Sequence, residues 1–282
     1  MNDAKLDAYR GFSYEVAEQI APTWERRRAD IEAVAGPVRE WMIRELAPKS
    51  GDTVLELAAG VGDTGFQAAT LIGERGRLIS SDFSPAMLEA ARRRGSELGI
   101  TNVEYRVIDA ERIELDDASV DGVLCRFGYM LMADAGTALT ETRRVVRPGG
   151  RLALAVWGLP ERNPFFTSAV MALVSRGHLQ PPEPGGPGIF ALANEAHLTA
   201  LLQGAGFDQV RTEEVSGRFA IPSIDEYVQV VADTAGPIAL AVRALPAVER
   251  NAVKAHCESA LEQFVVDSGY EIPCVALCAV AN

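Results

Sequence analysis

The residues with the clearest chemical role lie in and just after a short apolar run. The segment Val54 to Gly65 reads VLELAAGVGDTG, with one acid, Glu56, in the run and Gly60, Gly62 and Gly65 behind it. Glycine tolerates positive φ angles and lets another molecule approach the backbone closely. A strand that turns sharply into a helix at such glycines is therefore expected to hold a ligand. The G-x-G-x-x-G spacing alone fits a dinucleotide as well as other adenosine compounds.

Two acids in this segment separate the possible ligands. Glu56 lies inside the expected strand, and Asp63 lies inside the turn. A dinucleotide pyrophosphate binds to bare N–H groups at a helix N-terminus, and carboxylates close to it would repel it. S-adenosylmethionine (SAM) has no phosphate, and its sulfonium and ammonium groups are cationic, so carboxylates would attract it. The acids favour SAM, and an NAD(P)-dependent oxidoreductase is the alternative.

Two further acids follow the next two predicted strands along the chain. Asp82 follows the predicted strand 77–81 and lies 22 residues beyond Gly60, and Asp109 follows the predicted strand 103–108. Open α/β sheets bind ligands at the carboxyl ends of their strands. We therefore expect Glu56, Asp82 and Asp109 to meet at one edge of a sheet. There, Asp82 can accept hydrogen bonds from both hydroxyls of a ribose.

These residues resemble the class I SAM-dependent methyltransferases, most closely the ubiquinone/menaquinone C-methyltransferase-like (methyltransferase type 11) group. The first motif of that group has an acid, a small residue and a glycine pair, as do Glu56, Ala58, Gly60 and Gly62. Many class I enzymes have glycine in place of Ala58. The later stretch RVVRPGGRL also resembles the group, and the resemblance is clear over residues 48 to 157.

The resemblance implies a binding site for SAM, whose product is S-adenosylhomocysteine. It implies that Asp109 accepts the adenine amino group and that Phe83 and Met87 border the adenine. Arg126, after the fourth strand, is expected to reach the SAM carboxylate or the substrate. The full set of expected cofactor-binding residues is Glu56, Ala58, Gly60, Gly62, Asp82, Phe83, Met87, Asp109, Ala110 and Arg126.

The expected acceptor is a small organic molecule. The stretch 126–132 is apolar and lacks the Asp/Asn-Pro-Pro-Tyr type motif with which adenine, cytosine and glutamine N-methyltransferases hold their amino groups. The resemblance further implies that an N-terminal helical segment covers the cofactor, with Tyr9, Tyr14 and Trp24 as candidate lid residues. We expect an apolar acceptor pocket with a floor of Phe127, Tyr129 and Met130 and walls that include Tyr14 and Trp24.

Methyl transfer from SAM is an in-line displacement that depends mainly on alignment of the reactants in a dry pocket. A general base would help only if the acceptor is a hydroxyl or an acidic carbon. The candidates are Tyr14, Tyr129 and His178, which form no fixed constellation, so the catalytic residues stay open. No metal site is visible, which disfavours a magnesium mechanism. A non-catalytic SAM-binding module is a further alternative.

The elements that must position these residues alternate between strand and helix. Strands are predicted at 53–57, 77–81, 103–108, 120–125, 152–157, 209–215 and 272–280. Helices are predicted at 65–72, 84–99, 165–176 and 195–202, and the segment 147–151 is predicted to be a turn. The fold class is α/β, a Rossmann-like seven-stranded, mostly parallel sheet with helices on both faces. N-terminal helices and a helical insertion before the last strand complete it.

We expect one methyltransferase domain over residues 1–282. It comprises an N-terminal helical lid (1–46), a SAM-binding core (47–157), the remaining sheet and connections (158–221 and 271–282) and a helical cap insertion (222–270). In the lid, Thr23 is predicted to cap a helix after Pro22, and Pro37 is predicted to open the next helix. The segment Pro181 to Gly188, PPEPGGPG, is expected to be a loop.

Composition limits the possible partners. The chain has 27 basic and 39 acidic residues and a formal net charge of −12, which disfavours nucleic acid as a partner. We expect no signal peptide and no membrane span, and hence a cytoplasmic protein. The four cysteines, without zinc-type spacing, are expected to be reduced and apolar. The identity of the acceptor, the methylated atom and the oligomeric state stay open.

Overall fold

A computed structural model describes residues 3–181, 183 and 185–282. Its centre is a sheet of order β3-β2-β1-β4-β5-β8-β6, and a short β7 pairs with β8. Strands β1 to β5 are parallel to one another, and β8 is antiparallel to β5 and β6. The bounds are β1 Thr53–Glu56, β2 Arg77–Asp82, β3 Val103–Val107, β4 Val120–Arg126, β5 Val146–Trp157, β6 Arg211–Ile221, β7 Val265–Val266 and β8 Gly269–Ala281.

The predicted mostly parallel sheet is confirmed, with an eighth strand, the two-residue β7. Strand order reverses between β1 and β4, and such a switch point is where open α/β sheets form a crevice for ligands. Strands β1 to β4 end within one residue of their predicted limits. Strand β6 is longer than predicted and pairs with β8 over its whole length, from Arg211 to Ile221.

Strand β5 begins earlier than predicted because the glycine-rich stretch before it stays in the sheet. Val120 pairs with Val146 and Gly122 pairs with Arg151, so the residues between them on β5 form a bulge. Gly149 takes a φ of 80° in this bulge. The prediction of a turn at 147–151 is wrong, because these residues belong to β5. They still lie at the edge of the sheet opposite the glycine-rich turn, as predicted.

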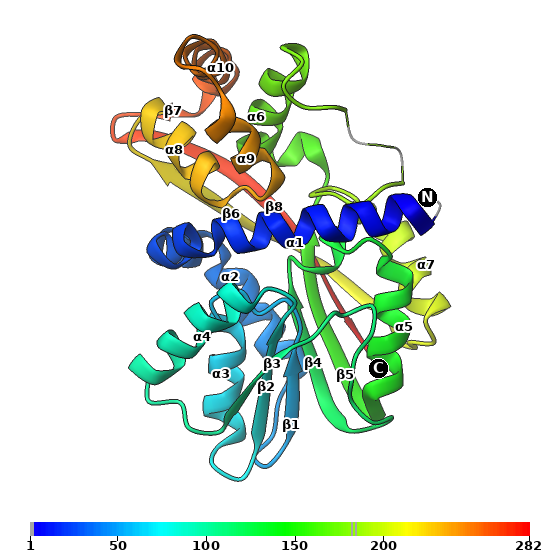
Figure 1. The fold of residues 1–282 in the computed structure, drawn as a ribbon. Coiled ribbons are helices and arrows are strands. Elements are labelled where there is room, and N and C mark those ends of the chain that lie inside the picture. Colours follow the sequence, from blue (N-terminus) through cyan, green and yellow to red (C-terminus); the bar gives the residue numbers. More distant parts are fainter. Residues whose placement is uncertain (1–2, 182, 184) are drawn as a thin grey trace.

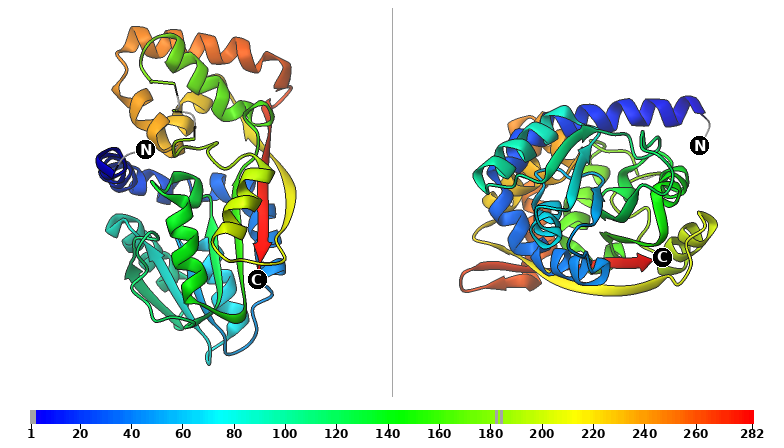
Figure 2. Two further views of the ribbon diagram at one scale, coloured as in Figure 1. Left: turned by 90° about the vertical axis from the view of Figure 1, so that its right-hand side faces the viewer. Right: turned by 90° about the horizontal axis from the view of Figure 1, so that it is seen from below.

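Alternating side chains of the buried strands divide the core into two layers. Val54 and Leu124 pack under α2, α3 and α4, whereas Leu55 and Val123 pack on the other face, which α5 and α7 cover (Figure 2). The helices of these two layers are α2 Arg28–Leu46, α3 Asp63–Ile72, α4 Pro85–Glu97, α5 Ala135–Val145 and α7 Glu195–Gly204.

A helical body stands beyond the carboxyl ends of the strands (Figure 1). It is built from α6 Pro164–Ser175, α8 Ile224–Thr234, α9 Pro237–Ala244 and α10 Ala247–Leu261, and the long strands β6 and β8 run up into it. We call these four helices the cap. The helix α1 Asp3–Arg26 lies across the molecule between the sheet and the cap.

The two N-terminal helices do not break at their prolines, contrary to prediction. Pro22 lies inside α1 and Pro37 lies inside α2, and the chain breaks instead at Arg27. Tertiary contacts offset the lost helical hydrogen bonds, since the Thr23 hydroxyl lies 2.6 Å from the carbonyl oxygen of Asp233 in α8. Thr23 is therefore a link to the cap and not an N-cap.

Helix α4 begins with a side-chain cap. Ser84 Oγ accepts the Met87 N–H at 3.1 Å, and Pro85 is the first helical residue. In α2, Val38, Trp41, Met42 and Leu46 are buried. All four cysteines are free and buried, as predicted. The expected loop 181–188 includes residues 182 and 184, which lie outside the described residues.

Candidate functional site

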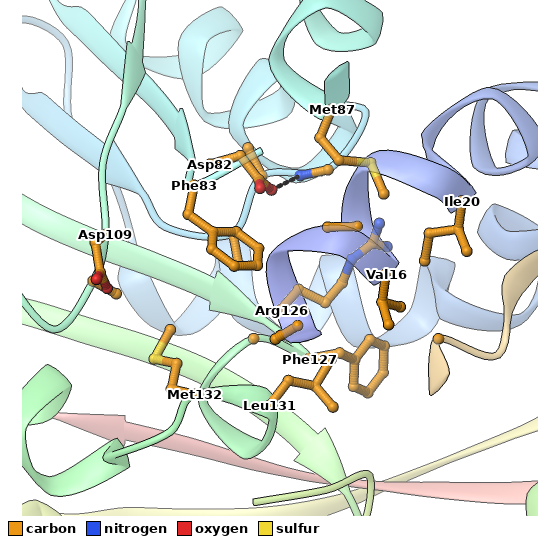
Figure 3. Close-up of a pocket in the computed structure, with 18 of the residues that line it drawn as sticks. Val16, Ile20, Asp82, Phe83, Met87, Asp109, Arg126, Phe127, Leu131 and Met132 are labelled. Atoms are coloured by element: carbon orange, nitrogen blue, oxygen red, sulfur yellow. Dashed lines mark hydrogen bonds between the residues drawn. The ribbon is translucent and has the colours of Figure 1, made fainter. Parts of the chain in front are cut away.

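A cavity lies at the carboxyl ends of β1, β2 and β4, next to the loops that follow β3 and β4 (Figure 3). Helix α1 forms its outer wall, and the beginning of α9, at Gly236 and Pro237, closes one side. Most of the expected cofactor-binding residues line it. They are Glu56, Ala58, Gly60, Asp82, Phe83, Met87, Asp109, Ala110 and Arg126.

Glu56 is a buried carboxylate at the end of β1. Its Oε1 accepts the Gly65 N–H at 2.7 Å, and burial raises its pKa to about 8. A Cβ on Gly65 would lie 2.2 Å from Glu56 Oε2, so a glycine is needed at 65 to make room for the acid. The last glycine of the motif thus serves the carboxylate and not a ligand directly.

The turn after β1 is held in left-handed conformations. Ala58, Gly60 and Gly62 have φ values of 50°, 55° and 88°. Alanine at such an angle is strained, and strain of this kind gathers at functional sites. A Cβ on Gly62 would meet the Phe66 ring at 2.5 Å, and Gly62 does not line the cavity. Gly62 therefore shapes the start of α3, whereas Gly60 faces the cavity.

Asp82 stands at the end of β2 with both carboxylate oxygens engaged. Oδ2 accepts the Gly60 N–H at 3.0 Å, and Oδ1 accepts the Ser84 N–H at 2.9 Å. The side chain is only 5% exposed, and burial raises its pKa to about 6. Each carboxylate oxygen has a second lone pair for a ligand hydroxyl. The two backbone contacts fix this acid at the rim of the glycine turn.

Asp109 stands at the opposite end of the cavity from Arg126 (Figure 3). Its Oδ1 accepts the Glu111 N–H at 2.9 Å, so the loop after β3 holds it in place. Phe83 lies between Asp109 and Arg126 in this view, and Phe83 and Met87 both line the cavity. The strand-end acids that the sequence predicts to meet are thus in one cavity.

Arg126 is a cation at the end of β4 whose side chain is 11% exposed. Its Nη2 donates to Glu32 Oε1 at 2.7 Å, and Glu32 also binds Arg39. Within the described residues its Nη1 is buried and has no hydrogen-bond partner. A buried donor without a partner is costly, so a ligand carboxylate at this end of the cavity would satisfy it.

Of the predicted acceptor residues, Phe127 and Trp24 line the cavity. The Phe127 ring stacks on Trp157 at 4.2 Å between centroids, with a φ of 61° that turns it out of the strand direction. Trp24 donates from Nε1 to the Thr234 carbonyl oxygen at 3.0 Å, which joins α1 to α8.

The structure does not place Tyr129 and Met130 on the floor of the cavity. The chain enters a 3₁₀ turn at Tyr129–Leu131, which directs both side chains inward. The Tyr129 hydroxyl contacts the Thr142 hydroxyl at 2.7 Å. Leu131 and Met132 line the cavity instead, and the apolar run 127–132 alone does not reveal which of its members do so.

The candidate bases also lie outside the cavity lining. Tyr14 is on the outer side of α1, 40% exposed, with its ring edge against Phe83. His178 lies in the loop that follows α6, with its Nε2 2.8 Å from a Glu249 carboxylate oxygen. Burial raises the pKa of Tyr129 well above its ordinary value, so its phenol stays protonated. None of the three is placed to take a proton from a ligand in the cavity.

Sequence reasoning missed most of the wall that α1 supplies. Tyr9, a predicted lid residue, lines the cavity together with residues at helical spacing along the same face, namely Ser13, Val16, Ala17, Ile20 and Trp24. This 3.6-residue period was the available signal. Burial raises the pKa of Tyr9 to about 12, so Tyr9 can donate a hydrogen bond but is a poor base.

Among residues 3–181, 183 and 185–282, no cluster of three or more His, Cys, Asp or Glu side chains is arranged to hold a metal ion. In the same part of the chain, no helix has the length and apolar character to cross a membrane.

Comparisons with known proteins agree with this geometry. Residues 37–169 match the model of the ubiE/COQ5 methyltransferase family. A demethylmenaquinone methyltransferase of Thermus thermophilus is 33% identical over 142 residues, which are 50% of this chain and 57% of that protein. UbiE of Cronobacter sakazakii, a ubiquinone/menaquinone biosynthesis C-methyltransferase, is 30% identical over 154 residues, 51% and 61% of the two chains. The match thus spans little more than half the length of these relatives.

A solved structure extends the likeness. The SAM-dependent methyltransferase from Aquifex aeolicus has a TM-score of 0.51 and 22% identity and covers 72% of this chain and 92% of its own. At this identity the likeness shows the fold alone. The matches confirm the resemblance to class I SAM-dependent methyltransferases and the Rossmann-like fold. They support SAM as the cofactor and methyl transfer as the activity of the matching region.

Proposed function

We propose that this chain, which resembles the class I SAM-dependent methyltransferases and matches the ubiE/COQ5 family over residues 37–169, transfers a methyl group from SAM to a small organic acceptor. The observation that carries the proposal is the cavity in which Glu56, Asp82 and Asp109 meet at the ends of three neighbouring strands. This is the crevice in which open α/β sheets bind ligands.

The residues fit each part of SAM. In the proposal, Asp82 holds the ribose hydroxyls, Asp109 holds the adenine amino group, and Phe83 and Met87 enclose the adenine ring. The partnerless Nη1 of Arg126 is available for the carboxylate. The bound cofactor supplies an electrophilic methyl group on a cationic sulfur, and a positive charge at that end of the cavity would favour the ionised form of Glu56 over the protonated form that burial favours.

The protein's own contribution to the reaction is alignment and exclusion of water. Helix α1 and the start of α9 close the cavity, and Phe127, Leu131 and Met132 give it an apolar side. In such a pocket, an in-line displacement needs the acceptor at near-attack distance and no metal or fixed base. A lidded apolar pocket of this kind suits a compact, weakly charged acceptor.

The names of the relatives indicate which acceptor to test first. They are a demethylmenaquinone methyltransferase and a ubiquinone/menaquinone biosynthesis C-methyltransferase. A reduced quinone ring would fit the aromatic side of the cavity, where Phe127 stacks on Trp157. We propose this class as the acceptor: a ring carbon takes the methyl group, S-adenosylhomocysteine leaves, and the ring proton that is displaced passes to solvent, because none of the three candidate bases lines the cavity.

The oxidoreductase alternative is not favoured, because the matching family model and the curated relatives are methyltransferases. Calorimetric titration with S-adenosylhomocysteine and with NADH separates the two functions. We expect binding of S-adenosylhomocysteine and no response to NADH, followed by transfer of label from methyl-labelled SAM to a reduced quinone. Binding of NADH alone would refute the proposal, and SAM binding without transfer to any acceptor in a panel would support the non-catalytic module.

The Asp82→Asn variant tests the ribose contact. Charge-assisted hydrogen bonds contribute about 1.5 to 3 kcal/mol each, so we expect the affinity for S-adenosylhomocysteine to fall by more than about tenfold. Asp121→Asn is the matched control, because Asp121 Oδ2 accepts the Thr53 N–H at 2.7 Å at the far end of the same sheet. Unchanged affinity in folded Asp82→Asn would show that Asp82 does not hold the ribose.

A further inference from the structure

One carboxylate of α1 is directed at the beginning of α4. Glu18 Oε1 accepts hydrogen bonds from the Ser84 hydroxyl at 2.6 Å and from the Ala86 N–H at 3.0 Å. Ser84 is fully buried, and its Oγ also accepts the Met87 N–H. A carboxylate at a helix N-terminus satisfies unpaired N–H groups and interacts favourably with the helix dipole. Glu18 therefore holds the first turn of α4 from outside that helix.

The contact continues into the cavity through the backbone of Ser84. The Ser84 N–H donates to Asp82 Oδ1 at 2.9 Å, and the Gly60 N–H donates to the other oxygen at 3.0 Å. An unbroken chain of hydrogen bonds thus joins α1, the start of α4, the end of β2 and the glycine turn. Without Glu18, the Ser84 hydroxyl loses its acceptor and the segment that orients Asp82 loses its outer support.

Apolar packing at the same level fixes α1 against the cavity. Val16 and Ile20, which flank Glu18 on α1, form one buried cluster with Met87. All three line the cavity. The hydrogen bonds of Glu18 and this apolar cluster thus join the same two helices, α1 and α4.

A second ion pair joins the same two helices at the surface. Arg93 of α4 binds Glu25 of α1 through two hydrogen bonds of 2.9 and 2.8 Å. These side chains are 51% and 37% exposed, and exposed pairs of this kind contribute little because solvent screens them. Glu25 is therefore a suitable control. Like Glu18 it joins α1 to α4, but its partner Arg93 does not line the cavity.

We propose that Glu18 is a positioning residue of the cofactor site, which acts through Ser84 to hold the Asp82 carboxylate and to seat α1 over the bound cofactor. The inference rests on the proposed function, in which Asp82 binds the ribose of SAM. The inference adds Glu18 of α1 to that function, as a residue that raises the affinity for the cofactor without contacting the cofactor.

Calorimetric titration of the full chain with S-adenosylhomocysteine tests the proposal. We expect Glu18→Ala to weaken binding by about 5 to 30-fold, the effect of one or two lost hydrogen bonds. Glu18→Gln keeps an oxygen that accepts from Ser84 and Ala86, so binding should stay within about threefold of the unmodified protein. Glu25→Ala should change affinity by less than about twofold.

A double-mutant cycle with Ser84→Ala shows whether the effect passes through that residue. If it does, Glu18→Ala adds less than about twofold in the Ser84→Ala background, because coupled residues are not additive. In turnover assays, the KM for SAM should rise in Glu18→Ala more than kcat falls. Ser84→Ala and Glu18→Gln also supply readings if Glu18→Ala fails to fold.

Two outcomes overturn the inference. One is unchanged affinity in folded Glu18→Ala, and the other is an equal loss in Glu25→Ala, which would show general loosening of α1. If Glu18→Ala does not fold, unchanged affinity in folded Ser84→Ala also overturns the inference. Absence of S-adenosylhomocysteine binding by the unmodified protein would instead refute the proposed function.

Discussion

At the scale of single residues, Glu56 couples the site to the stability of the whole fold. Burial raises its pKa to about 8, above the ordinary carboxyl value of 4.5. Between these values the folded chain binds more protons than the unfolded chain, so the free energy of unfolding falls as pH rises. The stabilising contribution of the protonated form is full below about pH 4.5 and is lost as pH passes through about 8.

We therefore predict that Glu56→Gln flattens this dependence. Between pH 6.5 and 8 the unmodified protein should lose about 1.6 kcal/mol of unfolding free energy, at up to about 1.4 kcal/mol per pH unit. The neutral amide still accepts from the Gly65 N–H and should show little change over the same range. Urea unfolding at several pH values measures this, with Glu114→Gln as the exposed control. Equal slopes in Glu56→Gln and the unmodified protein would contradict the prediction.

Gly60 supports a second prediction at this scale. Its φ of 55° strains any β-branched residue, and a Cβ there would already lie 3.8 Å from the Trp24 ring. We expect Gly60→Val to lose about 1 to 2 kcal/mol of stability and all detectable binding of S-adenosylhomocysteine.

Gly99→Val is the matched control for this change. Gly99 has a φ of 67° with no atom near its added Cβ, far from the cavity lining. It should show similar destabilisation in thermal unfolding and unchanged affinity in the titration. Normal binding by Gly60→Val would overturn the assignment of this turn to the ligand.

At the scale of elements, α1 joins the strand-end side of the site to the cap. It contacts the loop after β3 through the Arg10–Glu111 ion pair and the cap through the Trp24–Thr234 hydrogen bond. One face of α1 lines the cavity. We propose that this helix is a lid whose order depends on the cofactor beneath it.

Hydrogen exchange checks this proposal. Added S-adenosylhomocysteine should slow exchange in residues 9–24, because the ligand fills the space under that face and suppresses local opening. Helix α10, which does not line the cavity, should be unchanged. A ligand that binds without added protection in 9–24 would show that α1 is a fixed wall and not a lid.

At the scale of the whole molecule, charge limits the partners. The net charge of −12 repels a phosphate backbone, and binding to nucleic acid depends on neutralising phosphates with Lys and Arg. We predict that the protein does not retard tRNA or duplex DNA in gel-shift assays even at low salt. A basic protein of similar size is the positive control. Retardation that weakens steeply with added salt would reveal a basic patch and contradict the prediction.

The sequence alone determined the core of the site, because the carboxyl ends of parallel strands all lie at the same edge of a sheet. Acids at the ends of successive parallel strands must gather at one edge, so Glu56, Asp82 and Asp109 could be brought together without coordinates. The place of Gly60 at the ligand follows from the same sharp turn, whereas the role of Gly65 in making room for Glu56 did not. The fold class was equally predictable, since alternating strands and helices require crossovers over both faces.

Only the tertiary structure decided which neighbours of these acids face the cavity. A 3₁₀ turn exchanges Tyr129 and Met130 for Leu131 and Met132, and no periodicity marks such a turn within a uniformly apolar run. Contacts with the cap carry α1 through Pro22, where local rules predict a break. The wall of the cavity and the contact of Glu18 with Ser84 depend on this docking of segments far apart in the chain, which local residue preferences do not encode.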